Sequence, residues 1–189
     1  GNLGLSTPLI YGGGIRNAED AVKVVSMGAD RILIDALFWD SPHQIETISR
    51  ELGKQALIAN LPVRVENNSL YWHNYRSGKE IVLDEPAMKL LPIEWVSEVM
   101  LTDWRHEGSP ESFDLAILAL CPKMDAQLLA FGGLSATTQY LTALSLDNVA
   151  AVAVGNFLSY REHAIQKIKS AMAGLPIRAP RYAREQEET

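Results

Sequence analysis

The sequence predicts an α/β fold of the barrel type, with about six strand–helix units and a small β-hairpin excursion. Short, almost continuously apolar runs alternate with amphipathic stretches, as parallel strands covered by helices do. A glycine-rich turn after a strand occurs twice, in the same phase of an internal repeat. At 189 residues, with 47% hydrophobic and 21% charged residues, the chain can bury a full core.

The apolar runs and amphipathic stretches define the predicted elements in order. Strands are predicted at 8–11, 31–37, 55–61, 98–104, 127–131 and 149–155. Helices are predicted at 17–27, 42–52, 86–96, 112–120, 135–146 and 160–173. Asn17 is expected to cap the first helix. Residues 63–83 alternate in polarity and contain the turn sequences ENNS and RSGK, which predicts an antiparallel excursion. This alternation of strands and helices fits either a (β/α) barrel or an open doubly wound sheet.

An internal repeat favours the barrel. When the chain is shifted by 120 residues, YGGGIRN falls on FGGLSAT, RILIDALF on AVAVGNFL, and HQIETI on HAIQKI. The two copies cover about 11–52 and 131–172 and indicate two half-barrels within one domain, residues 1–176. Glycines at a strand-to-helix turn let backbone N–H groups approach a phosphate. Two such turns therefore predict two similar anion sites.

Bulk properties exclude several classes of function. A net charge of −6 argues against a nucleic-acid-binding surface. No apolar run approaches the roughly 20 residues that span a bilayer, and no signal peptide is visible. We therefore expect a cytoplasmic protein that binds no membrane. The single cysteine, Cys121, is interpreted as a packed thiol. The polar tail 177–189 is expected to be disordered.

Several stretches together resemble the histidine-biosynthesis barrel family, and especially the cyclase subunit of imidazole glycerol phosphate synthase. They are PLIYGGGIRNAEDAVKVVSMGADRILID, LGKQALI, SGKEI, VMLTDWRHEGSPESFD, LLAFGG and AVGNFLSYREHAIQKIK, in the family's order and spacing. The last stretch is most similar to cyclase-like members that act in surface-sugar biosynthesis beside a glutamine amidotransferase.

The resemblance implies a (β/α)8 barrel with its active site at the carboxyl ends of the strands. It also implies a bis-phosphorylated sugar–aminoimidazole substrate, one phosphate being held by each half-barrel. Ammonia would come from a partner glutaminase through the barrel core. Two aspartates, at the ends of the first and fifth strands, would carry the acid–base chemistry. No cofactor is implied.

Two departures from the family suggest impaired catalysis. The sequence starts at the family's third strand, so the barrel is expected to be incomplete and the first aspartate to have no counterpart. The fifth-strand aspartate position falls on Pro62, or on Leu61 after a shift of one, and neither side chain carries a transferable proton. Open strand edges predict a homo-oligomer. The chain is thus expected to be a cyclase-like protein with impaired chemistry; the alternative is a non-catalytic phosphosugar-binding or self-assembling scaffold.

The candidate site residues lie in both halves of the repeat. The family's DRDG segment is replaced by Arg105, His106, Glu107 and Gly108. Of these, Glu107 and His106 are weak candidates for a base and its partner, beside Arg105 as an anion contact. A phosphate site is expected in the second half of the chain, and its residues are Gly108, Gly132, Gly133, Gly155 and Asn156.

The first-half phosphate site is expected to be lost or changed. Gly12, Gly13 and Gly14 persist, but the strand-end pair that would supply an amide and a hydroxyl is Asp35 and Ala36. A carboxylate a few ångströms from a phosphate costs on the order of one to several kcal/mol unless a cation intervenes.

Other residues have simpler interpretations. By the resemblance, Asp30 matches a carboxylate that faces the glutaminase and Arg31 replaces a lysine that gates ammonia, although a surface loop residue is the favoured interpretation of Asp30. His43 and His163 recur at equivalent points of the repeat and are expected at the surface, without a metal. The aromatic residues are expected to pack rather than stack on bases; they are Tyr71, Trp72, Trp95 and Trp104.

Overall fold

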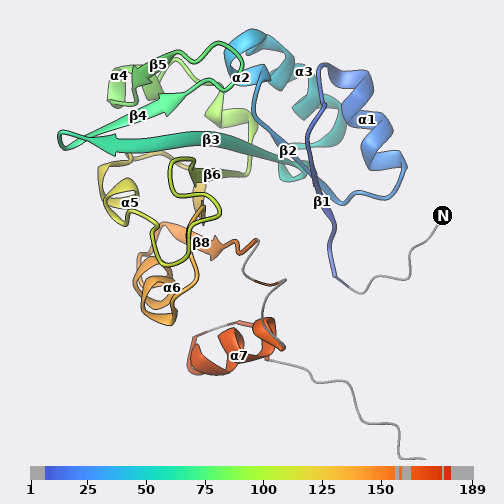
Figure 1. The fold of residues 1–189 in the computed structure, drawn as a ribbon. Helices are drawn as coiled ribbons and strands as arrows, with labels where there is room; N and C mark the ends of the chain where they lie inside the picture. Colours follow the sequence, from blue (N-terminus) through green and yellow to red (C-terminus); the bar gives the residue numbers. More distant parts are fainter. Residues whose placement is uncertain (1–6, 156–157, 159–162, 176, 180–189) are drawn as a thin grey trace, which may run out of the picture.

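A computed structural model describes residues 7–155, 158, 163–175 and 177–179 (Figure 1). Its eight strands form one sheet, with a parallel path in the order β1-β2-β3-β6-β7-β8. These six strands are β1 (Ile10–Gly12), β2 (Arg31–Ile34), β3 (Leu57–Glu66), β6 (Glu98–Asp103), β7 (Gln127–Phe131) and β8 (Val149–Val152). The path is a curled, incomplete (β/α)8-type sheet, which confirms the predicted fold class.

Helices alternate with the strands, and α7 follows the last of them. They are α1 (Ala18–Ser26), α2 (Leu37–Asp40), α3 (His43–Leu52), α4 (Glu85–Met88), α5 (Ala116–Leu120), α6 (Thr137–Leu144) and α7 (Ala164–Ala171), with two 3-10 turns, η1 (Lys54–Ala56) and η2 (Ile93–Trp95). Figure 1 shows α1 and α3 side by side next to β1 and β2. Asn17 caps α1 as predicted, because its Oδ1 accepts the amide hydrogen of Asp20 at 2.9 Å.

Several predicted elements are wrong in extent: the strand predicted at 149–155 ends at Val152, and the helix predicted at 112–120 begins at Ala116. Residues 86–96 form the short helix α4 and the turn η2 instead of one helix, because Pro92 has no N–H and disfavours helical backbone before it. The strand predicted at 31–37 ends at Ile34, and Leu37 already begins α2.

The antiparallel excursion is confirmed and is built on β3 itself. Beyond Ala59 the register with β2 stops, and from Val63 onward β3 pairs with β4 (Ser69–His73), which in turn pairs with β5 (Glu80–Val82). Pro62 lies at this changeover, in register with Thr102 of β6. Pro62 lies between the end of the β2–β3 pairing and the start of the β3–β4 pairing. A proline is tolerated there because neither β2 nor β4 needs a backbone amide hydrogen from position 62.

The core lies between the sheet and its helices. Its largest side chains include Ile32, Ile45, Leu61, Leu101 and Tyr140, all fully buried. In contrast, β1 has a single neighbour among the described strands, and its Ile10 and Tyr11 are 44% and 45% exposed. The predicted tail lies outside the described residues from position 180 onward.

Candidate functional site

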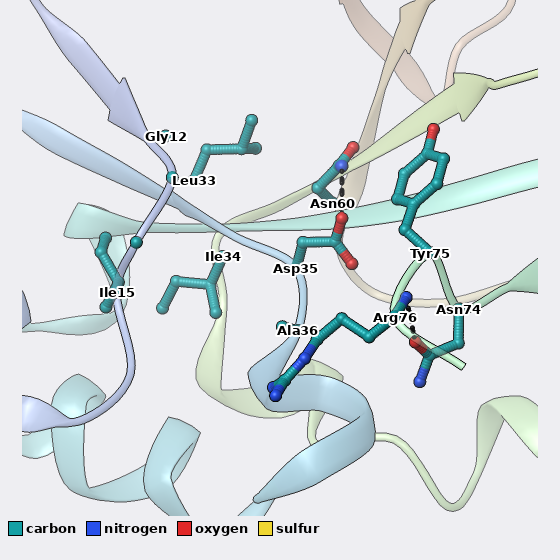
Figure 2. A pocket seen from close by; sticks show the side chains of 12 residues that line it. Gly12, Ile15, Leu33, Ile34, Asp35, Ala36, Asn60, Asn74, Tyr75 and Arg76 are labelled. Atoms are coloured by element: carbon teal, nitrogen blue, oxygen red, sulfur yellow. Dashed lines mark hydrogen bonds between the residues drawn. The ribbon is translucent and has the colours of Figure 1, made fainter. Parts of the chain in front are cut away.

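The carboxyl ends of the parallel strands and the loops that follow them form one edge of the sheet, where barrel folds place their sites. A cavity of about 390 Å³ opens there over β1, β2 and β3 (Figure 2). Its lining residues are Gly12, Gly13, Gly14, Ile15, Leu33, Ile34, Asp35, Ala36, Asn60, Asn74, Tyr75 and Arg76. The glycine triplet and the Asp35–Ala36 pair therefore meet in one cavity, as their positions at the ends of β1 and β2 predict.

Asp35 is the carboxylate of this cavity. Figure 2 shows it directed toward Asn60, whose Nδ2 donates to Asp35 Oδ2 at 3.3 Å. The Asn60 Oδ1 in turn accepts from the hydroxyl of Thr102 at 2.6 Å, which fixes the orientation of the amide. Burial raises the pKa of Asp35 to about 6, although the Asn60 hydrogen bond acts in the opposite direction. Asp35 therefore gains or loses its proton close to neutral pH.

The turn between β4 and β5 forms the opposite wall of the cavity. Asn74 Oδ1 accepts the amide hydrogens of Arg76 at 2.9 Å and Ser77 at 3.2 Å, which holds the turn closed. The guanidinium of Arg76 pairs with Asp40 at the end of α2. Burial, with a smaller effect of Glu107 and Asp35, raises the pKa of Tyr75 to about 12, so its phenol stays protonated.

A second group of polar residues follows β6. Asp103, 1% exposed, ends this strand, and its Oδ2 lies 2.7 Å from Nδ1 of His106, whose side chain is 43% exposed. The same oxygen accepts the amide hydrogen of Asp114 at 2.9 Å. His106 is therefore paired with Asp103, a partner that the sequence analysis missed because it considered Glu107 instead.

The second glycine turn packs against this loop. Gly132 and Gly133 have φ of +98° and +78°, a region that L side chains avoid. A Cβ on Gly132 would lie 2.5 Å from the carbonyl oxygen of Asp103, and one on Gly133 would lie 2.6 Å from Ser112 Oγ. The Gly133 carbonyl accepts the amide hydrogen of Ser112 at 3.0 Å. Close backbone packing thus accounts for both glycines, with or without a ligand.

The remaining predicted site residues lie around the same edge. Gly108 adopts φ of +82° in the loop after β6, and Gly155 packs on the ring of Phe131. Arg105 lies 3.8 Å from Glu66. Asn156 falls outside the described residues.

Residues at the opposite, amino-terminal edge are held by internal contacts. Arg31 pairs with Glu98 across β3 and donates through Nε to the Gln55 carbonyl at 2.9 Å. Asp30 is exposed, and its Oδ2 accepts the amide hydrogen of Leu9 at 2.8 Å. Both side chains therefore support the entry to β1 and β2.

Aromatic contacts and the thiol fit the packing interpretation. Trp72 lies 4.2 Å from Trp39 between ring centroids, and Trp104 stacks on His73 at 4.3 Å. Arginine guanidinium groups lie over the rings of Tyr71 and Trp95. Burial raises the pKa of Cys121 to about 12, which makes its thiol a poor nucleophile.

In the described part of the chain, no three His, Cys, Asp or Glu side chains gather closely enough to hold a metal ion. Within the same residues, every helix is too short or too polar to cross a bilayer.

Curled parallel strands with polar residues at their carboxyl ends define a protein of the (β/α)-barrel class. More particularly, the chain belongs to the histidine biosynthesis protein family, whose model matches residues 4–164. This confirms the resemblance on which the sequence analysis relied.

Curated relatives carry the name imidazole glycerol phosphate synthase subunit HisF. The protein from Exiguobacterium sp. (strain ATCC BAA-1283 / AT1b) is 27% identical over 171 residues, which cover 86% of this chain and 64% of the relative. Those from Thermococcus onnurineus and Pyrococcus furiosus are 24% and 27% identical over 182 and 184 residues, covering 90% of this chain and 69% of each relative. The chain thus spans about two thirds of the length of these relatives.

Proposed function

We propose that this chain is a HisF-like protein that binds a phosphorylated, sugar-type small molecule but does not perform the acid–base chemistry of a cyclase. One observation carries the proposal. Pro62, at the position that the resemblance assigns to the fifth-strand aspartate, is a buried residue of β3 in register with Thr102. Proline can neither accept nor deliver a proton in a catalytic step.

Ligand binding is proposed for the loop after β6 and the turn after β7. Gly108, Gly132 and Gly133 all adopt positive φ there, and of the three Gly108 is exposed, so its backbone can be approached without a side chain in between. His106 is held through Nδ1 by the buried Asp103, and its partly exposed ring keeps Nε2 for contact with a ligand. Arg105, 44% exposed, adds a cation beside it. An arginine side chain beside an exposed glycine turn suits a phosphate.

Two further parts of the proposal concern partners and assembly units. The relatives are named as subunits, and by the resemblance we propose a glutaminase as the partner of this chain, near Asp30. We also propose that residues 1–176 act as one barrel unit with two half-barrel repeats.

Calorimetric titration with ribose 5-phosphate and with inorganic phosphate tests the binding. His106→Gln combined with Arg105→Gln should weaken binding at least about tenfold, whereas His43→Gln, an exposed histidine on α3, should not change it. Gly133→Asp is a poor choice, because a Cβ there meets Ser112 and would disturb folding. Unchanged affinity in the double variant would contradict the proposed site.

Ammonia-dependent turnover of the family's substrate tests the catalytic part. The chain should show no turnover, because Pro62 cannot accept or deliver a proton at the position of the fifth-strand aspartate. Turnover at the rate of an active family enzyme would overturn this interpretation of Pro62.

A self-assembling scaffold is the second candidate, and the free edge of β1 favours it. Leu9, Ile10 and Tyr11 expose apolar surface along a strand with one described neighbour, and such edges recruit further strands. Light scattering should then report a dimer or larger species, and Ile10→Lys should shift it toward the monomer. A monodisperse monomer of 20.8 kDa would exclude this candidate.

A further inference from the structure

The cavity over β1, β2 and β3 carries an uncompensated negative charge. Two of its lining residues are charged, Asp35 and Arg76. The Arg76 guanidinium is already paired with Asp40. Among the described residues that line the cavity, none offers Asp35 a second cation. The cavity is therefore suited to a ligand that brings a positive charge.

The Asp35 carboxylate is only half used. Its Oδ2 accepts the long 3.3 Å hydrogen bond from Asn60, while its Oδ1 accepts none from any residue that the structure describes. The Asn60 amide cannot turn to do more, because its Oδ1 is bound by Thr102 at 2.6 Å. A carboxylate oxygen in such a place is a ready acceptor for a charged donor.

An anionic ligand would be repelled at the same point. A phosphate near Asp35 faces like-charge repulsion, and Arg76, the one cation among the lining residues, is engaged with Asp40. We propose that this cavity binds a small molecule carrying an ammonium group on a hydroxylated carbon skeleton, with the Asp35 carboxylate as the partner of the ammonium. This inference concerns a different place from the loop after β6 and does not depend on phosphate binding there.

The other walls match the rest of such a ligand. In Figure 2, Tyr75 and Gly12 lie on opposite sides of the view, with Asp35 between them. An aromatic face attracts a cation within about 6 Å of its centroid. Asn74, whose Oδ1 is occupied by two backbone amides, keeps its Nδ2 to donate to a hydroxyl. Ile15 and Ile34 provide apolar surface, and about 390 Å³ is within the size range of small-molecule pockets.

Binding should depend on the protonation of Asp35. The charged and titratable groups around it are Asp40 and Arg76, which pair with each other, and His73 and Tyr75 of the β4–β5 hairpin. Tyr75 stays neutral in the useful range, and the Asp35→Asn variant separates the response of Asp35 from any response of His73. Affinity for an ammonium ligand should increase from pH 5 to pH 7, as the carboxyl loses its proton through a pKa of about 6.

The test is a titration of the ¹⁵N-labelled chain with glucosamine, glucose and ribose 5-phosphate, followed by NMR at pH 7 and pH 5. Glucosamine should bind at least about tenfold more tightly than glucose and shift the amides of Gly13, Gly14 and Asn60. Asp35→Asn should remove this preference. Asp147→Asn, at an exposed aspartate before β8, should keep it. Arg76→Gln, which removes a cation, should bind glucosamine at least as tightly as the unmodified chain.

Several outcomes would overturn the inference. They are equal affinity for glucosamine and glucose, full affinity in Asp35→Asn, no binding of glucosamine, and a ribose 5-phosphate response centred on Gly13 and Asn60. A ribose 5-phosphate response centred on Gly108 and Gly133 belongs to the proposed phosphate site, so success or failure at the two places can be separated. Because Asp35→Asn keeps the shape of the side chain, its amide spectrum serves as the control for folding.

Discussion

The ring Nδ1 of His106 lies 2.7 Å from Oδ2 of Asp103, at the point where β6 ends and its loop begins. The same oxygen accepts the Asp114 amide at 2.9 Å, so one buried carboxylate binds both ends of the 104–114 segment. This arrangement makes Asp103 a structural anchor for the residues proposed to bind phosphate.

Replacing Asp103 by Ala should lower the free energy of unfolding by about 2 kcal/mol, because two hydrogen bonds to a charged acceptor are lost. Urea denaturation followed by circular dichroism measures the change. Asp125→Ala, at an exposed aspartate before β7, is the control and should stay within about 0.5 kcal/mol. Equal stability of the two variants would contradict the anchoring role.

Gly132→Ala should destabilise the chain by more than about 2 kcal/mol. Its φ of +98° costs an L residue roughly 1–2 kcal/mol, and the new Cβ would lie 2.5 Å from the Asp103 carbonyl oxygen. The matched control is Gly28→Ala, since Gly28 has φ of +114° and a Cβ added there would have nothing within 4 Å. If both variants lose the same free energy of unfolding in urea, the claim that the turn at Gly132 packs closely on β6 is contradicted.

Stability should fall as the pH rises from 4 to 6 through the contribution of Asp35. Its pKa is about 6 when folded and about 3.9 when unfolded, so between these values the folded chain binds more protons than the unfolded chain. Ionisation therefore favours unfolding as the pH rises. Asp35→Asn should be more stable than the unmodified chain at pH 7, with the difference shrinking toward pH 4. Urea denaturation at both pH values measures the difference in free energy of unfolding between the two chains. A difference that does not change with pH would contradict the raised pKa of Asp35.

Arg64→Met should destabilise the hairpin by about 2–3 kcal/mol. The Arg64 side chain is 8% exposed and pairs with Glu80 at 2.6 Å and Glu66 at 2.7 Å. Removing this buried cation leaves both carboxylates without their nearest counter-charge. The hydrogen bond to Arg64 also holds the pKa of Glu80 below its usual range.

Arg50→Met is the matched control for Arg64. Arg50 forms an exposed pair with Glu46 one turn away on α3, and such pairs contribute about 0.3–0.5 kcal/mol. If Arg64→Met loses no more stability than Arg50→Met, the hairpin does not depend on the buried cation. Thermal unfolding of both variants gives the comparison.

Local sequence was sufficient where an element follows its own pattern. The strand 127–131 and the cap at Asn17 were predicted as they occur, because apolar runs and capping side chains act within a few residues. The division of 86–96 at Pro92 was missed, although the proline itself was the available signal.

Long-range contacts were less accessible from the sequence. The Asp35–Asn60–Thr102 chain joins the residue after β2 to β3 and β6, and only the alignment of these strands in the sheet reveals it. The Asp103–His106 pair was within reach, since the two residues are three apart, but a carboxylate at the end of a buried strand was interpreted as part of the strand. The contribution of Tyr75 and Arg76 to the cavity depends on where the hairpin folds back, which local patterns do not encode.

The divided pairing of β3 allows the two ends of this strand to unfold locally at different rates. Its first half is bonded to β2 and β6, and its second half to β4 and β6, with Pro62 at the junction. Amide hydrogen exchange along this one strand would therefore report two separate events. Slow exchange at 63–66 with faster exchange at 57–59 would mean that β1 and β2 detach while the hairpin stays in place, so that the cavity loses one wall and keeps the other.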